Sequence, residues 1–148
     1  MDEDFVLSAG DSVGGTRIER LVGAIVAIFA AKGTFFDYIV NNTDPAYVSF
    51  ELDILWAFHP GADPAALLKK YGPRFKLMHV KDLRKGVVGD FSGSTSVEND
   101  VALGTGQIDV ANVIEAAKKS AIEHYYIEDE SSSVSVQVPQ SLKFLKSL

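Results

Sequence analysis

The pattern of hydrophobic and polar residues predicts three short strands, each with polar residues at its C-terminal end. Phe75–Asp82 has the order Phe-Lys-Leu-Met-His-Val-Lys-Asp. This order is typical of a buried strand that carries polar groups at its C-terminal end. Val48–Asp53 ends in the same way on a carboxylate, and His124–Glu128 ends on another. We therefore expect three strands that present Asp, His and Glu at their ends.

Two amphipathic segments between these strands predict helices. In Asp63–Tyr71, an Asp-Pro pair supplies the N-cap and the first helical residue, and a Gly-Pro pair follows the end. Asp109–Ser120 has the same design, with Asp109 as the N-cap. Its predicted buried stripe comprises Val110, Val113, Ile114 and Ala117. The alternation of strands and helices predicts an α/β fold with a parallel sheet.

Further helices are predicted at either side of this unit. Thr34 is a suitable N-cap for a helix that ends near Asn42, before an Asp-Pro pair. Helical spacing places Phe35, Tyr38 and Ile39 on one face, which we expect to be buried. At the other end of the chain, residues 139–148 predict a short amphipathic helix.

A long polar segment follows the strand that carries the histidine. Arg84–Ala102 is rich in Gly and Ser and has no clear periodicity. Long loops beside an active site often act as lids. We therefore predict that this segment is the most mobile internal part of the chain.

The first part of the chain is harder to assign. Residues 1–20 are acidic and then Gly-rich, so we expect a loop or arm there, followed by one domain over 21–148. The apolar run at 21–31 resembles the core of a secretory signal, but it begins late and follows an acidic stretch. Its eleven residues are too few to cross a bilayer, which takes about 20. A buried strand or helix in a cytoplasmic protein, with no membrane partner, is the preferred interpretation.

Composition narrows the possible partners and chemistries. The 148 residues carry a net charge of -6, are 47% hydrophobic and include no cysteine. No cluster of Lys and Arg is present, which argues against a nucleic-acid partner. Disulfides, thiolate zinc sites and a cysteine nucleophile are excluded.

The three strand ends are the candidate site. In a parallel sheet the C-terminal ends of the strands share one edge, so Asp53, His79 and Glu128 are expected to converge. Oxygen, nitrogen and oxygen donors suit Mn, Mg, Co or Zn. Each residue also has a structural interpretation: Asp53 as a turn or loop cap, His79 as a hydrogen-bonded core residue, and Glu128 as part of a solvated acidic turn.

Two neighbouring residues are candidates for substrate contact. Lys81 is placed to bind substrate oxygens, or equally to form an ion pair with Asp82 or Glu51. Trp56 is placed to form the floor of a sugar site, or to pack in the core.

Several motifs together carry a family resemblance over residues 33–148. They are Asn42–Pro45, Phe50–Asp53 with Trp56, Asp63-Pro64, Lys70-Tyr71, Arg74-Phe75, His79–Asp82, Leu103–Asp109 and Tyr126–Glu128. In order and spacing, this set resembles the sugar isomerase/epimerase family of xylose isomerase-like TIM barrels. The resemblance implies a partial (β/α) barrel that supplies the C-terminal strands and helices of that fold.

The resemblance also implies a metal-dependent reaction on a sugar or polyol. Asp53, His79 and Glu128 would be ligands of a divalent metal, Glu128 would also be a candidate base, and Lys81 or Trp56 would contact substrate. The family has a fourth ligand, a Glu, on the preceding strand, whereas residues 22–30 of this chain contain no carboxylate. We therefore expect weak metal binding and impaired proton transfer between adjacent carbons.

A complete barrel of this family needs about 250 residues. We therefore expect the chain to supply only the C-terminal half of a barrel, as a fragment, a truncated gene product or one half of an assembly. Its open strand edges would pair with another copy or with another half barrel. The alternative function is a non-catalytic barrel fragment that acts as a ligand-binding or assembly module.

Overall fold

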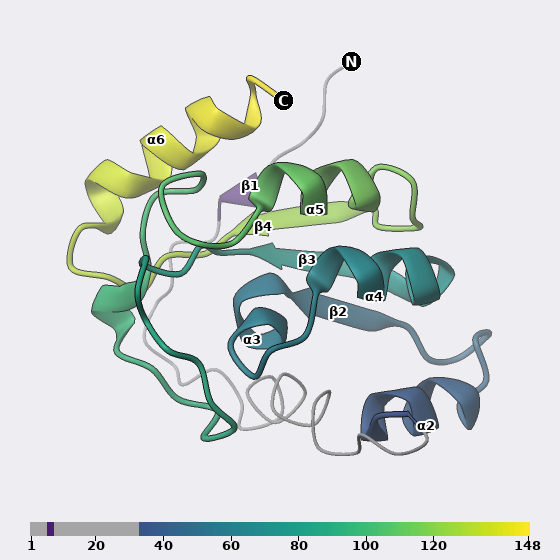
Figure 1. Cartoon of the computed structure of the whole chain (residues 1–148). Coiled ribbons are helices and arrows are strands. Elements are labelled where there is room, and N and C mark those ends of the chain that lie inside the picture. The colour runs from purple at the N-terminus through teal and green to yellow at the C-terminus, as the bar shows by residue number, and fades with distance from the viewer. Residues whose placement is uncertain (1–5, 8–32) are drawn as a thin grey trace.

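A parallel sheet forms the centre of the computed structural model, which describes residues 6–7 and 33–148. Its strands are β1 (Val6–Leu7), β2 (Phe50–Asp53), β3 (Phe75–Val80) and β4 (His124–Ile127). Their spatial order is β1-β4-β3-β2, and each neighbouring pair is parallel (Figure 1). The three strands expected from the sequence are therefore adjacent. The mixed α/β architecture with a parallel sheet is confirmed, and it is consistent with part of a barrel.

The strand β1 lies in the segment for which the sequence predicts a loop. Val6 and Leu7 pair with Tyr126 and Ile127 of β4. The rest of the expected arm and the apolar run at 21–31 lie outside the described residues.

Helices connect and cover the strands. They are α2 (Phe35–Asn41), α3 (Ile54–Phe58), α4 (Pro64–Tyr71), α5 (Val110–Ala117) and α6 (Val134–Leu145), with short 3-10 turns at Gly72–Arg74 and Val97–Asn99. Helices α4 and α5 pack side by side over one face of the sheet (Figure 1). They lie between β2 and β3 and between β3 and β4 in the chain, as crossover helices of parallel strands do.

Helices α4 and α5 form as the sequence predicts. The Asp63 carboxylate accepts hydrogen bonds from the backbone N–H of Ala65 and Ala66, at 2.9 and 3.2 Å. The Asp109 carboxylate accepts one from Asn112, at 3.2 Å. These caps satisfy donors that the first helical turn leaves free. All members of the predicted α5 stripe are buried.

In α2 the N-cap prediction is confirmed and the prediction of the buried face is wrong. Thr34 and Asp37 form a capping box. Phe36 and Val40 are buried, whereas Phe35 is 41% exposed and Tyr38 is 63% exposed. The helix is apolar at most positions, so its periodicity does not select a face. The packing of the Phe36 ring against Phe50, Phe75 and Tyr71 does.

Helix α3 was not expected from the sequence, and the predicted start of the last helix needs correction. The chain turns directly into α3 after Asp53. Helix α6 begins at Val134, five residues before the predicted start, and it contains Pro139. Proline commonly opens a helix, which explains the late prediction.

One hydrophobic cluster joins these elements. It includes residues from β2, β3, β4 and from α2 through α6, and its most buried large side chains include Ile54, Leu55, Phe75, Met78 and Ile127. Over the described residues, no helix has the length and apolar character needed to cross a membrane.

Asp82, which follows β3, holds the end of the long loop that leads into α5. Its buried carboxylate accepts hydrogen bonds from the backbone N–H of Leu83, Gly104, Gly106 and Ile108, at 2.8 to 3.1 Å. At Gly106 an added Cβ would lie 2.2 Å from Asp82 Oδ1, so only glycine fits. The Gly-Thr-Gly sequence therefore wraps around a carboxylate of its own chain.

Candidate metal centre

The register of the sheet brings the three predicted ligands together. Asp53 at the end of β2 pairs with His79 of β3. Glu128 follows β4, and its backbone N–H donates to the carbonyl of Val80 at 3.3 Å. One donor atom from each of Asp53, His79 and Glu128 lies within 4.8 Å of the others. The predicted convergence of these strand ends is therefore present in the structure.

The donor atoms lie close to one another. His79 Nδ1 lies 2.7 Å from Glu128 Oε2 and 3.8 Å from Asp53 Oδ2. Glu128 Oε2 is buried, and among the described residues no donor reaches it with hydrogen-bond geometry, despite the short distance to His79. A buried carboxylate oxygen without a donor, next to an imidazole nitrogen and a second carboxylate, fits a divalent cation.

Glu51 orients the histidine ring from the other side. Its Oε1 lies 2.9 Å from His79 Nε2, which leaves Nδ1 directed at Asp53 and Glu128. A metal-ligating histidine usually has a carboxylate, a backbone carbonyl or a water on its second nitrogen. Glu51 is expected from the sequence to support the site, and its contact with His79 identifies the ligand that it supports.

Asp53 caps a helix and also faces His79. Its Oδ1 accepts hydrogen bonds from the backbone N–H of Leu55 and Trp56, each at 2.9 Å, and so caps α3. Its Oδ2 is the oxygen that faces His79. The cap therefore fixes the direction of the second oxygen toward the candidate metal centre.

The electrostatic environment of the candidate metal centre favours the charged forms of His79 and Glu128. Burial by itself lowers the pKa of His79, but the carboxylates of Asp53, Glu128 and Glu51 outweigh it and raise that pKa to about 12. Burial by itself raises the pKa of Glu128, but His79 and Lys81 outweigh it and lower that pKa to about 2. In the absence of a metal, the imidazolium occupies the place of a cation between the carboxylates.

Lys81 is part of the same network. Its side chain is 3% exposed, and its Nζ lies 3.2 Å from both Glu128 Oε1 and Glu130 Oε2. These are its ion-pair partners, in place of the Asp82 or Glu51 considered from the sequence. Burial by itself lowers the pKa of Lys81, but the charges of Asp53 and Glu128, with smaller contributions from further carboxylates, raise it above its usual value.

Asp100 extends the network to the loop after β3. Its buried carboxylate accepts a hydrogen bond from the backbone N–H of Glu130 at 2.9 Å. Burial raises the pKa of Asp100 to about 6, against the lowering effects of that hydrogen bond and of Lys81. No sequence signal distinguished Asp100 or Glu130, because their partners lie about 30 to 50 residues away in the chain.

Trp56 lies in α3, one turn beyond the Asp53 cap. It is partly buried against the hydrophobic cluster, and its ring centroid is 5.8 Å from that of His59. Packing therefore accounts for at least part of its position, and its contact with substrate stays a prediction.

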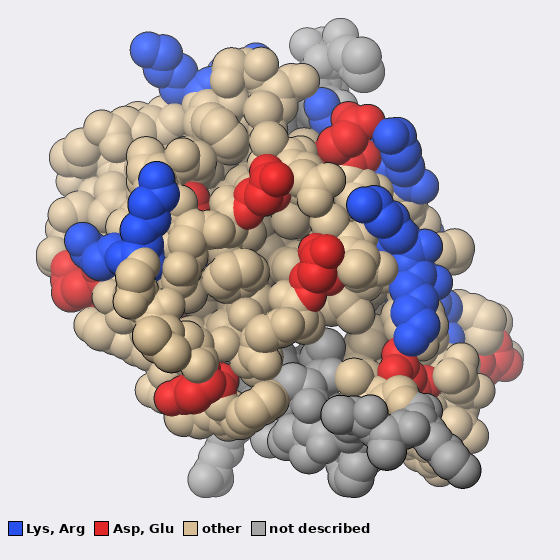
Figure 2. Space-filling view, viewed as in Figure 1, with Lys and Arg blue, Asp and Glu red and all other residues tan. Residues whose placement is uncertain are grey.

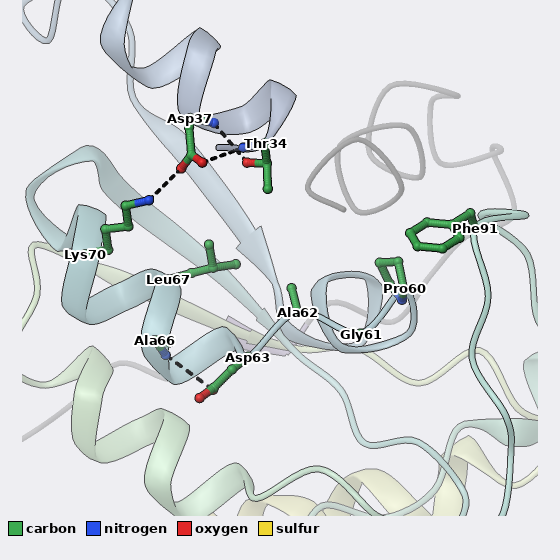
Figure 3. Close-up of a pocket in the computed structure, with 10 residues that line it drawn as sticks. All are labelled: Thr34, Asp37, Pro60, Gly61, Ala62, Asp63, Ala66, Leu67, Lys70 and Phe91. Carbon is green, nitrogen blue, oxygen red and sulfur yellow. Dashed lines mark hydrogen bonds and ion pairs between the residues drawn. The ribbon is translucent and has the colours of Figure 1, made fainter. Parts of the chain in front are cut away.

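A separate hollow of about 410 Å³ lies between α2, α4 and the loop before α4 (Figure 3). Its lining includes Asp37, Lys70, Pro60 and Phe91, and none of the three candidate ligands. Asp37 accepts hydrogen bonds from Lys70 Nζ at 2.9 Å and from the Tyr71 hydroxyl at 2.5 Å, which ties α2 to α4. These bonds serve the packing of the two helices.

A segment of the chain is similar to inosose dehydratases. It is 42% identical over 55 residues to the inosose dehydratases of Bacillus anthracis and of Bacillus thuringiensis subsp. konkukian. It is 42% identical over 50 residues to inosose dehydratase 1 of Bacillus cereus. The longer match covers 37% of this chain and 18% of the relatives, so it spans less than a fifth of their length. No protein-family model matches the chain.

Proposed function

We propose that the chain holds a divalent metal with Asp53, His79 and Glu128, and that this centre serves sugar or polyol chemistry of the xylose isomerase-like type. The observation that carries the proposal is the convergence of three donor atoms within 4.8 Å at the ends of adjacent parallel strands. The partial similarity to inosose dehydratases supports the same class of substrate.

The proposed reaction begins with removal of a proton from a carbon next to a carbonyl. Isomerisation, epimerisation and dehydration of a hydroxy-ketone share this step. A bound divalent metal would polarise the carbonyl and so acidify that carbon. The chain itself contributes the ligand set, the orientation of His79 by Glu51, and the orientation of Asp53 by the α3 cap.

Glu128 is better suited to the role of ligand than to that of base. One of its oxygens faces Lys81, the other faces His79, and the pKa of Glu128 lies at about 2. A carboxylate with so low a pKa is a weak acceptor of protons at neutral pH. This observation favours the second candidate function, a barrel segment that binds metal and ligand but supports little turnover alone.

Calorimetry with Mn²⁺ tests the metal centre. We expect detectable but weak binding to the unaltered chain, because three ligands hold the ion without a fourth carboxylate. Binding should be lost in His79→Ala and Glu128→Gln, and in Asp53→Asn, which retains an oxygen to cap α3. A suitable control is His124→Ala, at the exposed opposite end of β4.

Two outcomes would contradict one or the other part of this proposal. Equal binding by the unaltered chain and by His79→Ala would contradict the metal centre. Robust isomerase or dehydratase turnover by this chain alone would contradict the non-catalytic alternative and would require an acid or base that we have not identified.

A further inference from the structure

The two oxygens of the Glu128 carboxylate contact two different cationic side chains. Its Oε1 lies 3.2 Å from Lys81 Nζ, and its Oε2 lies 2.7 Å from His79 Nδ1. It is Oε2 that contacts the nitrogen of His79 that also lies 3.8 Å from Asp53 Oδ2. The two oxygens of this ligand are therefore not equivalent.

We propose that Lys81 is a positioning residue that fixes Glu128 as a one-oxygen metal ligand. Its ammonium retains Oε1, so that Oε2 alone is available to a divalent cation. The inference rests on the metal centre proposed above and assigns a specific task to a side chain next to it.

Lys81 is held firmly enough for this task. Its side chain is 3% exposed, and Glu130 Oε2 contacts its Nζ at 3.2 Å. The backbone of Glu130 is fixed in turn by the buried Asp100 carboxylate. The Lys81 ammonium does not exchange easily with water, because its side chain is buried and its loss would leave the partly buried Glu128 carboxylate without this cation.

The consequence is a lower coordination number at the metal. Carboxylates bind divalent cations through one oxygen or through two, and a free Glu128 could use both. Retention of Oε1 by Lys81 removes one donor from the cation. It also keeps a coordination position open, which a catalytic centre needs for substrate oxygens.

Cobalt is a suitable probe because the visible bands of Co²⁺ lose intensity when its coordination number increases. We would titrate Co²⁺ into the unaltered chain, into Lys81→Met and into Lys76→Met. Lys76 is a matched control, since it lies on the same strand and pairs with Glu123 at the surface. We expect weaker bands and roughly tenfold tighter Co²⁺ binding in Lys81→Met, because a donor is gained and a nearby positive charge is removed. Lys76→Met should match the unaltered chain.

A second variant distinguishes the proposed effect of Lys81 from a folding defect. Lys81→Met leaves Glu128 and Glu130 without their cation, so we would also examine Lys81→Met combined with Glu130→Gln, which keeps the local net charge. The double variant should show the same weakening of the Co²⁺ bands. Unchanged bands in the variants, or weaker Co²⁺ binding than in the unaltered chain, would overturn the proposal.

The two proposals fail in different ways. Absence of Co²⁺ binding to the unaltered chain would overturn the metal centre and, with it, the role of Lys81. Binding by the unaltered chain with bands that Lys81→Met does not change would overturn the role of Lys81 alone.

Discussion

Asp100 is a buried carboxylate whose ionisation opposes folding. Its pKa is raised from 3.8 to about 6, mainly by burial. Between these two values the folded chain binds more protons at this group than the unfolded chain does. The contribution of Asp100 to the free energy of unfolding therefore decreases as the pH rises through that window.

The substitution Asp100→Asn should remove this decrease. Because a shift of one unit corresponds to about 1.4 kcal/mol, we expect the variant to gain about 1–3 kcal/mol relative to the unaltered chain between about pH 4 and pH 7. Urea unfolding at several pH values measures the difference. Asp44→Asn, in an exposed turn, is the control. If the curves for Asp100→Asn and the unaltered chain run parallel, the raised pKa is wrong.

The site residues that the sequence could predict are those whose positions follow from the geometry of the parallel strands alone. Asp53, His79 and Glu128 end adjacent parallel strands, so the sheet brings them together whatever their own contacts are. The partners Glu130 and Asp100 depend on side-chain directions and on distant segments, which a single sequence does not show.

At the scale of elements, the sequence predicts a helix correctly where the segment has a clear N-cap residue and one distinct apolar face. The helices α4 and α5 carry an Asp N-cap and a clear apolar stripe, and both were predicted. Helix α2 is apolar on several sides, and α3 is a single turn whose cap is also a candidate ligand. In these two cases tertiary packing, rather than periodicity, decides the structure.

The loop after β3 is anchored at several points along its length. The backbone carbonyl of Asp90 lies 3.1 Å from His59 Nδ1, and Gln107 donates to the carbonyl of Val87 at 2.8 Å. At Gly89 an added Cβ would lie 1.7 Å from the carbonyl oxygen of His59. The predicted mobility of Arg84–Ala102 is therefore opposed by specific contacts and stays a prediction.

Limited proteolysis measures how far these contacts hold the loop. The substitution Gly89→Ala should displace it from His59, because the new methyl group has no space, and so increase the rate of tryptic cleavage after Arg84 and Lys85. Val88→Ala, at a side chain that is 88% exposed, should leave the rate unchanged. Equal rates for Gly89→Ala and the unaltered chain would show that this contact does not restrain the loop.

At the scale of the molecule, the described sheet is open. Its outer strands, β1 and β2, are not paired with each other. On the face seen in Figure 2, basic side chains line the right-hand side and also occur at the left and top, with acidic side chains among them. Open edges of a parallel sheet favour pairing with another chain.

We propose that the chain associates with a second copy or with another half barrel. Light scattering after size exclusion, at roughly 10–100 μM, should give a mass above that of one chain, and the mass should increase with concentration because association follows mass action. A constant mass of one chain over this range would contradict association with a second copy and leave another half barrel as the proposed partner.

The two tasks of Asp53 have a consequence for how such a centre is lost over evolutionary time. One oxygen caps α3 and the other faces His79. Selection for folding alone would keep an aspartate at this position after selection for chemistry had ended, because loss of a cap costs about 1 kcal/mol. The presence of the aspartate alone is therefore poor evidence for a working centre.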